Sequence, residues 1–362
     1  MSALAVARSL PQDSADNFYF MSLKKYFLTG ALGLAVSLPA FAQMPTANQQ
    51  VDSVQQRRQL EKAAQMMIAT NAVPELYTGE SSDVGPQSVL QTKPRRTYIE
   101  AFADAQYFYT DNMFLANQKK QGADVLVSTV SAALAPTAYD FQEGSLAPRL
   151  GFQQQWFNYG LTGPQTVDAY NFSTHTFSRV NLNQFDFNAM TIFSDVAWSK
   201  QNWTVALGGY YRQLNDAQNT DQFYNEYVPN WAIRYNLFTS DKTAISIGYE
   251  GDCRLTDTAN VPPKNGSNFN NRVDNSLVVA GSWRLCRYAI LQPSYRFQQT
   301  HFTTTWRDDY LNSFALALYI PFNDYVTLRG YVSYDILKTD GFYVENSDTL
   351  NAGVGLNLTV RF

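Results

Sequence analysis

Apolar and polar residues alternate strictly over residues 350–362, where the chain ends. The apolar set consists of Leu350, Ala352, Val354, Leu356, Leu358, Val360 and Phe362, and every residue between them is polar or glycine. Successive side chains of a β-strand point to opposite faces, so a period of two predicts a strand with one apolar and one polar face.

Eleven further segments with strand-like patterns precede this one. They cover residues 98–109, 124–135, 149–159, 185–198, 203–214, a stretch ending at 231–237, 245–251, 274–285, 288–299, 310–320 and 325–336. The composition agrees with a β-rich protein, because the chain has 23 Tyr and 24 Phe and only 16% charged residues. A tilted strand of about 9–11 residues can cross a bilayer, so the pattern predicts about twelve membrane-crossing strands.

The connections between these segments alternate in length. Short turns are predicted at 199–202, 239–242, 286–287 and 323–324, and long loops at 160–183, 255–271 and 300–309. All the short turns then lie at the end of the barrel that carries the carboxy-terminus, as in barrels whose periplasmic turns are short and whose external loops are long. The connection at 136–148 is longer than this scheme predicts.

Together these features resemble the porin-like outer-membrane β-barrels of Gram-negative bacteria, over residues 97–362. The resemblance implies an all-β, closed antiparallel transmembrane barrel of about twelve strands in the outer membrane, surrounded by lipid. In this class the final aromatic residue is part of a signal read by the outer-membrane assembly machinery. Phe362, with Leu358 and Val360 on the same face, matches that signal.

The amino-terminal part of the chain has a different pattern. Residues 1–42 are interpreted as a signal-peptide region with the true start at Met21, because Lys24 and Lys25 precede an apolar stretch at 27–38. Residues 43–96 are predicted to form a periplasmic helix over 51–72 followed by a linker. A plug folded into the barrel and a helix that binds a periplasmic partner are the alternatives.

Charged residues of the predicted strands fall on the face opposite the apolar one, and this face would line the lumen. The predicted lumen-lining residues are Arg149, Arg212, Arg234, Arg254, Arg284, Arg296, Arg329, Glu100, Asp104, Glu250, Asp252 and Asp335. A lumen of this kind favours a passive channel for small hydrophilic solutes, with an anion preference if the arginines are unpaired. The alternative is a barrel that does not conduct, acting as a structural or export-complex component whose helix binds periplasmic partners.

Reactive side chains are scarce. The strand assignment places Cys253 and Cys286 near opposite ends of the barrel, too far apart for a disulfide bond. The two histidines do not complete a zinc site, and His301 beside Asp308 and Asp309 is interpreted as a solvated loop histidine rather than a catalytic one. We therefore expect no enzyme activity, metal or cofactor, and the net charge of -4 argues against a nucleic-acid partner.

Overall fold

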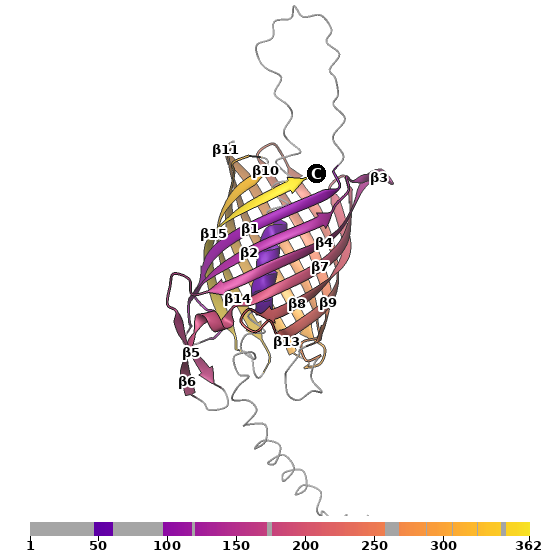
Figure 1. Cartoon of the computed structure of the whole chain (residues 1–362). Coiled ribbons are helices and arrows are strands. Elements are labelled where there is room, and N and C mark those ends of the chain that lie inside the picture. Colours follow the sequence, from indigo (N-terminus) through magenta and orange to yellow (C-terminus); the bar gives the residue numbers. More distant parts are fainter. Residues whose placement is uncertain are drawn as a thin grey trace, which may run out of the picture.

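The computed structural model describes residues 47–60, 97–117, 120–171, 176–257, 268–286, 288–305, 307–323, 325–341 and 345–362. Twelve of its strands form one antiparallel barrel (Figure 1). These strands are β1 (Ile99–Thr110), β2 (Ala123–Leu134), β4 (Gly144–Tyr159), β7 (Phe187–Lys200), β8 (Trp203–Asp216), β9 (Gln222–Thr239), β10 (Thr243–Asp257), β11 (Arg272–Cys286), β12 (Ala289–Phe302), β13 (Arg307–Pro321), β14 (Val326–Thr339) and β15 (Ser347–Arg361). The predicted signal region at 1–42 lies outside the described residues.

The first and last strands close the barrel. β1 pairs with β15 in a continuous antiparallel register that runs from Glu100 opposite Arg361 to Thr110 opposite Asn351. Every other barrel strand pairs with its neighbours along the chain, so no strand edge is left open. Closure satisfies the backbone hydrogen bonds internally, which a sheet in lipid requires. The prediction of a closed twelve-stranded barrel is confirmed.

The two connections of unusual length contain extra secondary structure. In the 136–148 connection, β4 begins five residues before the predicted start, and β3 (Tyr139–Phe141) folds back on it through a tight turn at Gln142 and Glu143. In the 160–183 connection, β5 (Thr166–Asn171) and β6 (Thr176–Asn181) form a hairpin before the short helix η1 (Leu182–Phe185). Figure 1 shows β3 at the end that carries the carboxy-terminus and β5–β6 at the opposite end.

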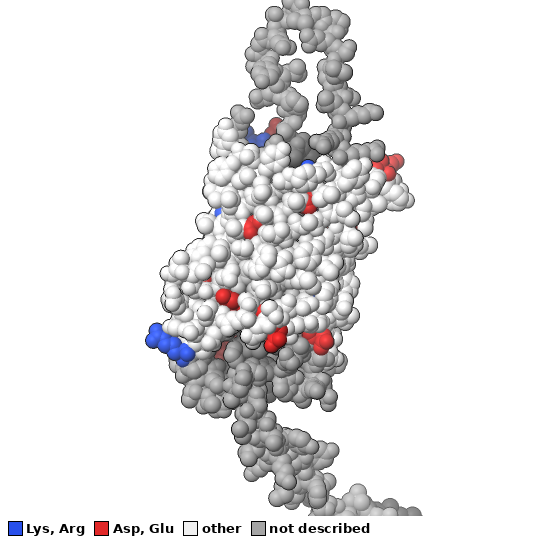
Figure 2. Space-filling view, in the orientation of Figure 1, with Lys and Arg blue, Asp and Glu red and all other residues white. Residues whose placement is uncertain are grey.

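Large apolar side chains cover the outside of the barrel. On β15, Leu350, Val354, Leu356 and Leu358 are each more than 40% exposed. Few charged residues are visible on the wall that faces the viewer in Figure 2. Cross-strand aromatic pairs such as Trp203 and Tyr235, whose ring centroids lie 4.6 Å apart, add to this surface. An apolar wall of this extent is suited to lipid rather than to water.

The helix at residues 47–60, called the lumen helix below, lies inside the ring of strands (Figure 1). It contacts strands all around the barrel, including β1, β4, β8, β10, β12 and β14. A helix outside the barrel could reach only adjacent strands. The predicted periplasmic position of this helix is therefore wrong for the described residues, and the predicted part at 61–72 lies outside them.

The lumen accommodates the helix because both its apolar and its charged side chains find complementary partners on the strands. Val51 and Val54 are fully buried in an apolar cluster, whereas Asp52 and Arg58 form ion pairs with strand residues. In the periplasm the same valines would remain in water, at a cost that burial removes. Among the described helices, none has the length and apolar character needed to cross a membrane.

Candidate functional site: the lumen and its helix

A cluster of charges holds one side of the lumen helix to the wall. The Asp52 carboxylate lies 2.9 Å from Arg212 of β8, 2.7 Å from Arg254 of β10 and 3.7 Å from Arg272 of β11. These three side chains are nearly or wholly buried, and buried arginines require nearby negative charge. Three further carboxylates complete the cluster: Glu226 lies beside Arg212 and Arg254, Asp252 beside Arg254, and Asp274 beside Arg254 and Arg272.

A second charged group lies between the lumen helix and the barrel seam. Arg58 of the helix approaches Asp104 of β1 at 3.7 Å and donates a hydrogen bond to Gln153. Arg329 of β14 lies 3.2 Å from the same carboxylate. To reach β1 it crosses β15 at Gly355, where an added Cβ would lie 2.8 Å from the guanidinium. The glycine therefore leaves room for the Arg329 side chain to pass over β15 and pair with Asp104 of β1.

The third contact surface of the lumen helix is apolar. Ala47, Val51 and Val54 pack in one cluster with lumen-facing residues of β1, β2, β4, β7, β8 and β9. Within it, the rings of Phe157 and Phe187 stack with their centroids 4.3 Å apart. This cluster fills the lumen on the β2–β9 side.

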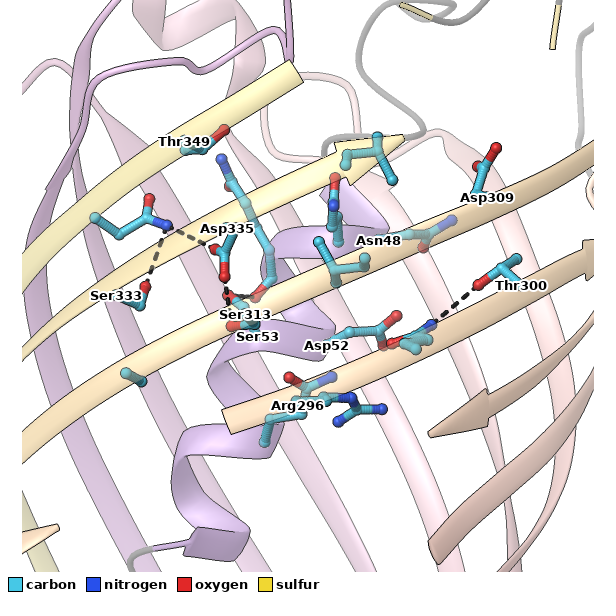
Figure 3. Close-up of a pocket in the computed structure, with 18 of the residues that line it drawn as sticks. Asn48, Asp52, Ser53, Arg296, Thr300, Asp309, Ser313, Ser333, Asp335 and Thr349 are labelled. Atoms are coloured by element: carbon cyan, nitrogen blue, oxygen red, sulfur yellow. Dashed lines mark hydrogen bonds between the residues drawn. The ribbon is translucent and has the colours of Figure 1, made fainter. Parts of the chain in front are cut away.

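On the opposite side, a cavity of about 240 Å³ separates the lumen helix from the wall. Its lining comes from the helix, from β9 to β15 and from β1, together with loop residues at the end opposite the carboxy-terminus. Figure 3 shows Asp52 and Ser53 on the helix side and Ser313, Ser333, Asp335 and Thr349 on the strands. Most of the strand residues at the cavity are polar or charged, so the site can hold water and a small polar solute.

The structure places the charges predicted for the lumen in four groups. Arg234, Glu250, Arg296 and Asp335 line the cavity. Arg212, Arg254 and Asp252 belong to the cluster around Asp52, and Arg329 and Asp104 belong to the group at the seam. The remaining three lie near the end that carries the carboxy-terminus, where Arg149 pairs with Asp195, Glu100 pairs with Arg361, and Arg284 lies on the same face of β11 as buried Ser282.

The predicted assembly-signal residues lie on the outer wall. Leu358 is 43% exposed and Phe362 60% exposed, and Val360 is half-buried between them. Phe362 also closes the barrel end, because its carbonyl accepts hydrogen bonds from the amides of Tyr98 and Ile99.

Several functional residues were missing from the predicted lumen set. Arg272 shares the face of Asp274, but the predicted strand began at 274 and so excluded it. Glu226 lies directly across from Arg212, in the part of β9 for which the sequence pattern did not define a start. Asp52 and Arg57 belong to the helix, and no periodicity within the helix indicates that it enters the barrel. A search for carboxylates to neutralise the buried arginines is the one signal that could have pointed to Asp52.

The histidine and cysteine residues form no catalytic arrangement in the described part of the chain. His301 Nδ1 lies 2.8 Å from Asp308 of the adjacent strand, whereas Asp309 faces the lumen and pairs with Arg307. Asp308 and Asp309, which are adjacent in the sequence, thus lie on opposite faces of β13. Cys253 and Cys286 are free thiols near opposite ends of β10 and β11, as predicted.

Comparisons with known proteins find similar barrels among solved structures only. No protein-family model and no curated protein sequence matches the chain. Among solved structures, an outer-membrane channel from Pseudomonas putida F1 is 10% identical, with a TM-score of 0.46, over 78% of this chain and 100% of that one. The translocator domain of autotransporter NalP from Neisseria meningitidis is 11% identical, with a TM-score of 0.41, over 86% and 97% of the two chains. The KdgM porin is 10% identical, with a TM-score of 0.35, over 71% and 98%.

All three are outer-membrane β-barrels. The closed ring of twelve strands and its apolar outer wall give this chain the same architecture. The chain is a closed antiparallel β-barrel of twelve strands. The lumen helix divides its interior into a packed side and an open side.

Proposed function

We propose that this barrel is a channel for small hydrophilic solutes in the outer membrane of a Gram-negative bacterium, and that the lumen helix narrows its pore. The observation that carries this proposal is the cavity of about 240 Å³ between the helix and the wall formed by β9 to β15 and β1. On the other side the apolar cluster and the Asp52 ion pairs leave the helix firmly attached. Solutes would therefore pass along the open side, where small polar side chains line the path.

The ion pairs in the lumen reduce the anion preference that the arginine content suggests. The cavity is lined by five arginines and four carboxylates, the latter being Asp52, Glu250, Asp309 and Asp335. Arg234, Arg272 and Arg307 each have a carboxylate within 3.5 Å. Because paired charges largely cancel at a distance, we propose only a weak preference for anions.

The second candidate function is a barrel that does not conduct. The number of contacts between the lumen helix and the strands favours it, since a helix held this firmly could close the pore. The helix does not favour the periplasmic-partner version of this function. Residues 51–60 face the lumen of their own barrel, and the rest of the predicted partner helix lies outside the described residues.

Single-channel conductance in a planar bilayer tests the proposal. We expect the refolded mature chain to give discrete current steps, and a variant that lacks residues 47–60 to give larger ones. Steps only from the deletion variant would instead identify the helix as a complete plug. Current steps from neither protein, with both shown to be folded barrels by circular dichroism, would refute the channel and favour the structural barrel.

We also propose that the outer-membrane assembly machinery recognises the carboxy-terminal strand. Phe362 and Leu358 are exposed on the outer wall, where another protein could read them before lipid covers them. Replacing Phe362 with Ser should reduce the amount of folded barrel in the outer membrane. Refolding into lipid vesicles in vitro should be nearly unchanged, because that process does not use the machinery.

A further inference from the structure

Arg57 of the lumen helix is a cation without a carboxylate partner among the described residues. Its Nε and Nη2 donate hydrogen bonds to the carbonyl and hydroxyl oxygens of Ser53, one turn earlier in the same helix. Its guanidinium lies over the ring of Tyr331, 4.2 Å from the centroid. The remaining nitrogen, Nη1, is buried and has no hydrogen-bond partner, although Arg57 lines the cavity.

Asp335 of β14 is the corresponding anion at the same cavity. It accepts hydrogen bonds from the Ser313 hydroxyl at 2.5 Å and from the Asn351 amide at 3.1 Å, and no cation of the described chain forms an ion pair with it. Figure 3 shows Asp335 with these bonds on the strand side of the cavity. Two neutral donors orient the carboxylate, while Arg57 and Arg296 act on its charge from beyond ion-pair distance.

These two groups differ from the other charges of the lumen. Asp52, Glu226, Asp274 and Asp104 each lie within 3.5 Å of an arginine. Arg296, also at the cavity, has only a distant carboxylate at 3.7 Å, and its Nε is buried without a partner. The cavity is therefore lined by Arg57 and Arg296, each with one buried nitrogen that has no hydrogen-bond partner among the described residues, and by Asp335, which forms no ion pair with those residues.

We propose that this cavity binds a small zwitterionic solute, with its anionic group at Arg57 and its cationic group at Asp335. The volume of about 240 Å³ lies below the about 300–1,000 Å³ typical of sites for drug-sized ligands, which restricts the solute to a small molecule. A zwitterion can form a charge-assisted hydrogen bond with each of the two groups at once, whereas a simple anion or cation can form one with only one of them. This inference rests on the proposed channel and names the class of its solute.

Isothermal titration calorimetry on the full mature barrel in detergent tests the proposal with matched probes. We would compare ω-amino acids of increasing length, such as 4-aminobutyrate, with the alkanoate and the alkylammonium ion of equal chain length. We expect at least one amino acid to bind about tenfold more tightly than both of its singly charged counterparts, as a charge-assisted hydrogen bond predicts. Equal binding of all three classes, or no binding of any amino acid, would overturn the proposal.

Two variants assign the two ends of the ligand. Asp335→Asn should remove the preference of the barrel for the amino acid over the alkanoate, and Arg57→Gln should remove its preference over the alkylammonium ion. Arg57→Lys should retain most of the binding, because it retains the charge. Asp140→Asn is the control, since Asp140 is an exposed carboxylate on β3 outside the lumen. Loss of binding in this control, or unchanged preferences in the first two variants, would contradict the assignment.

The outcomes for the site and for the channel can be separated. Current steps without amino-acid binding would retain the channel and refute the zwitterion site. Binding without current steps would retain the site and refute the channel. Circular dichroism of each variant shows whether the barrel has folded, so that a loss of binding is not confused with a loss of structure.

Discussion

The two sides of the lumen are built from the same alternation of residues and yet have opposite characters. On the packed side, large side chains such as Phe157, Phe187 and Leu214 point inward and pack in one apolar cluster with Val51 and Val54 of the helix. On the open side the inward positions of β12 to β15 carry smaller polar residues, including Ser294, Ser313, Ser333 and Thr349. The size of the inward-facing side chains, rather than the barrel itself, determines where the lumen remains open.

The carboxylates on the two sides also have different partners. Asp52, at the boundary with the packed side, has three arginines within 4 Å, so its charge is compensated inside the protein. Asp335, on the open side, accepts hydrogen bonds from neutral donors and forms no ion pair with the described residues, although Arg57 and Arg296 act on its charge from a greater distance. The ion pairs of Asp52 hold the helix in place, whereas Asp335 contributes no ion pair to it.

Deleting the lumen helix should change the difference between the two sides of the lumen more than any other variant, and single-channel conductance measures this change. Without residues 47–60 the packed side loses its partner, and the open side merges with the space that the helix vacates. An α-helix with its side chains is about 10–12 Å wide, so we expect a severalfold increase in single-channel conductance. Deleting the β3 turn at 139–143 is the control and should leave conductance unchanged. Equal conductance with and without the helix would show that it does not narrow the pore.

Neutralising Asp52 should loosen the helix without deleting it. Asp52→Asn leaves Arg212, Arg254 and Arg272 with less negative charge nearby, and breaking such a buried network costs about 2–4 kcal/mol. We expect amide hydrogen exchange in the peptide covering 47–60 to become about 100-fold faster. Asp195→Asn removes a carboxylate whose arginine partner, Arg149, lies away from the helix, so helix exchange should not change. Similar exchange rates in the two variants would show that Asp52 does not hold the helix in place.

Two substitutions on opposite faces of the helix compare the packed and open sides directly. Val54→Ala removes methyl groups that are fully buried, which should destabilise helix docking by about 1–2 kcal/mol. Gln56→Ala changes a side chain that faces the cavity, and the effect should stay below about 0.5 kcal/mol. Hydrogen exchange of the same helix peptide measures both. A larger effect for Gln56→Ala would mean that the open side also holds the helix.

Much of this fold could be predicted from the sequence, because the period-two pattern acts within each strand. Each of the twelve predicted strands is present, and the face of residues such as Arg212 and Arg329 follows from their parity alone. The position of the lumen helix could not be predicted, since it depends on contacts between Asp52 and residues more than 150 positions away. Parity also cannot tell which carboxylate pairs with a lumen arginine such as Arg254, because its contact with Asp52 arises only from the packing of the helix in the lumen.

The outer end of the packed side should show a small pH dependence. Burial, with a further contribution from nearby Asp216, raises the pKa of Asp186 from 3.8 to about 6, although the carboxylate accepts a hydrogen bond from the Tyr159 amide. A raised pKa means that the folded state favours the protonated form. Its stabilising contribution is therefore complete below pH 3.8 and lost as the pH rises through about 6.

Because Asp186 is only half-buried, we expect the loss to be about 1 kcal/mol once solvent screening is included. Urea unfolding of the barrel in lipid vesicles at pH 4 and pH 7.5 would measure it. Asp186→Asn keeps an acceptor for the Tyr159 amide but cannot titrate. The part of the stability difference between pH 4 and pH 7.5 that comes from Asp186 should therefore be absent in this variant. A wild-type barrel that gains stability between these pH values in comparison with the variant would show that solvent, rather than the packed side, controls this carboxylate.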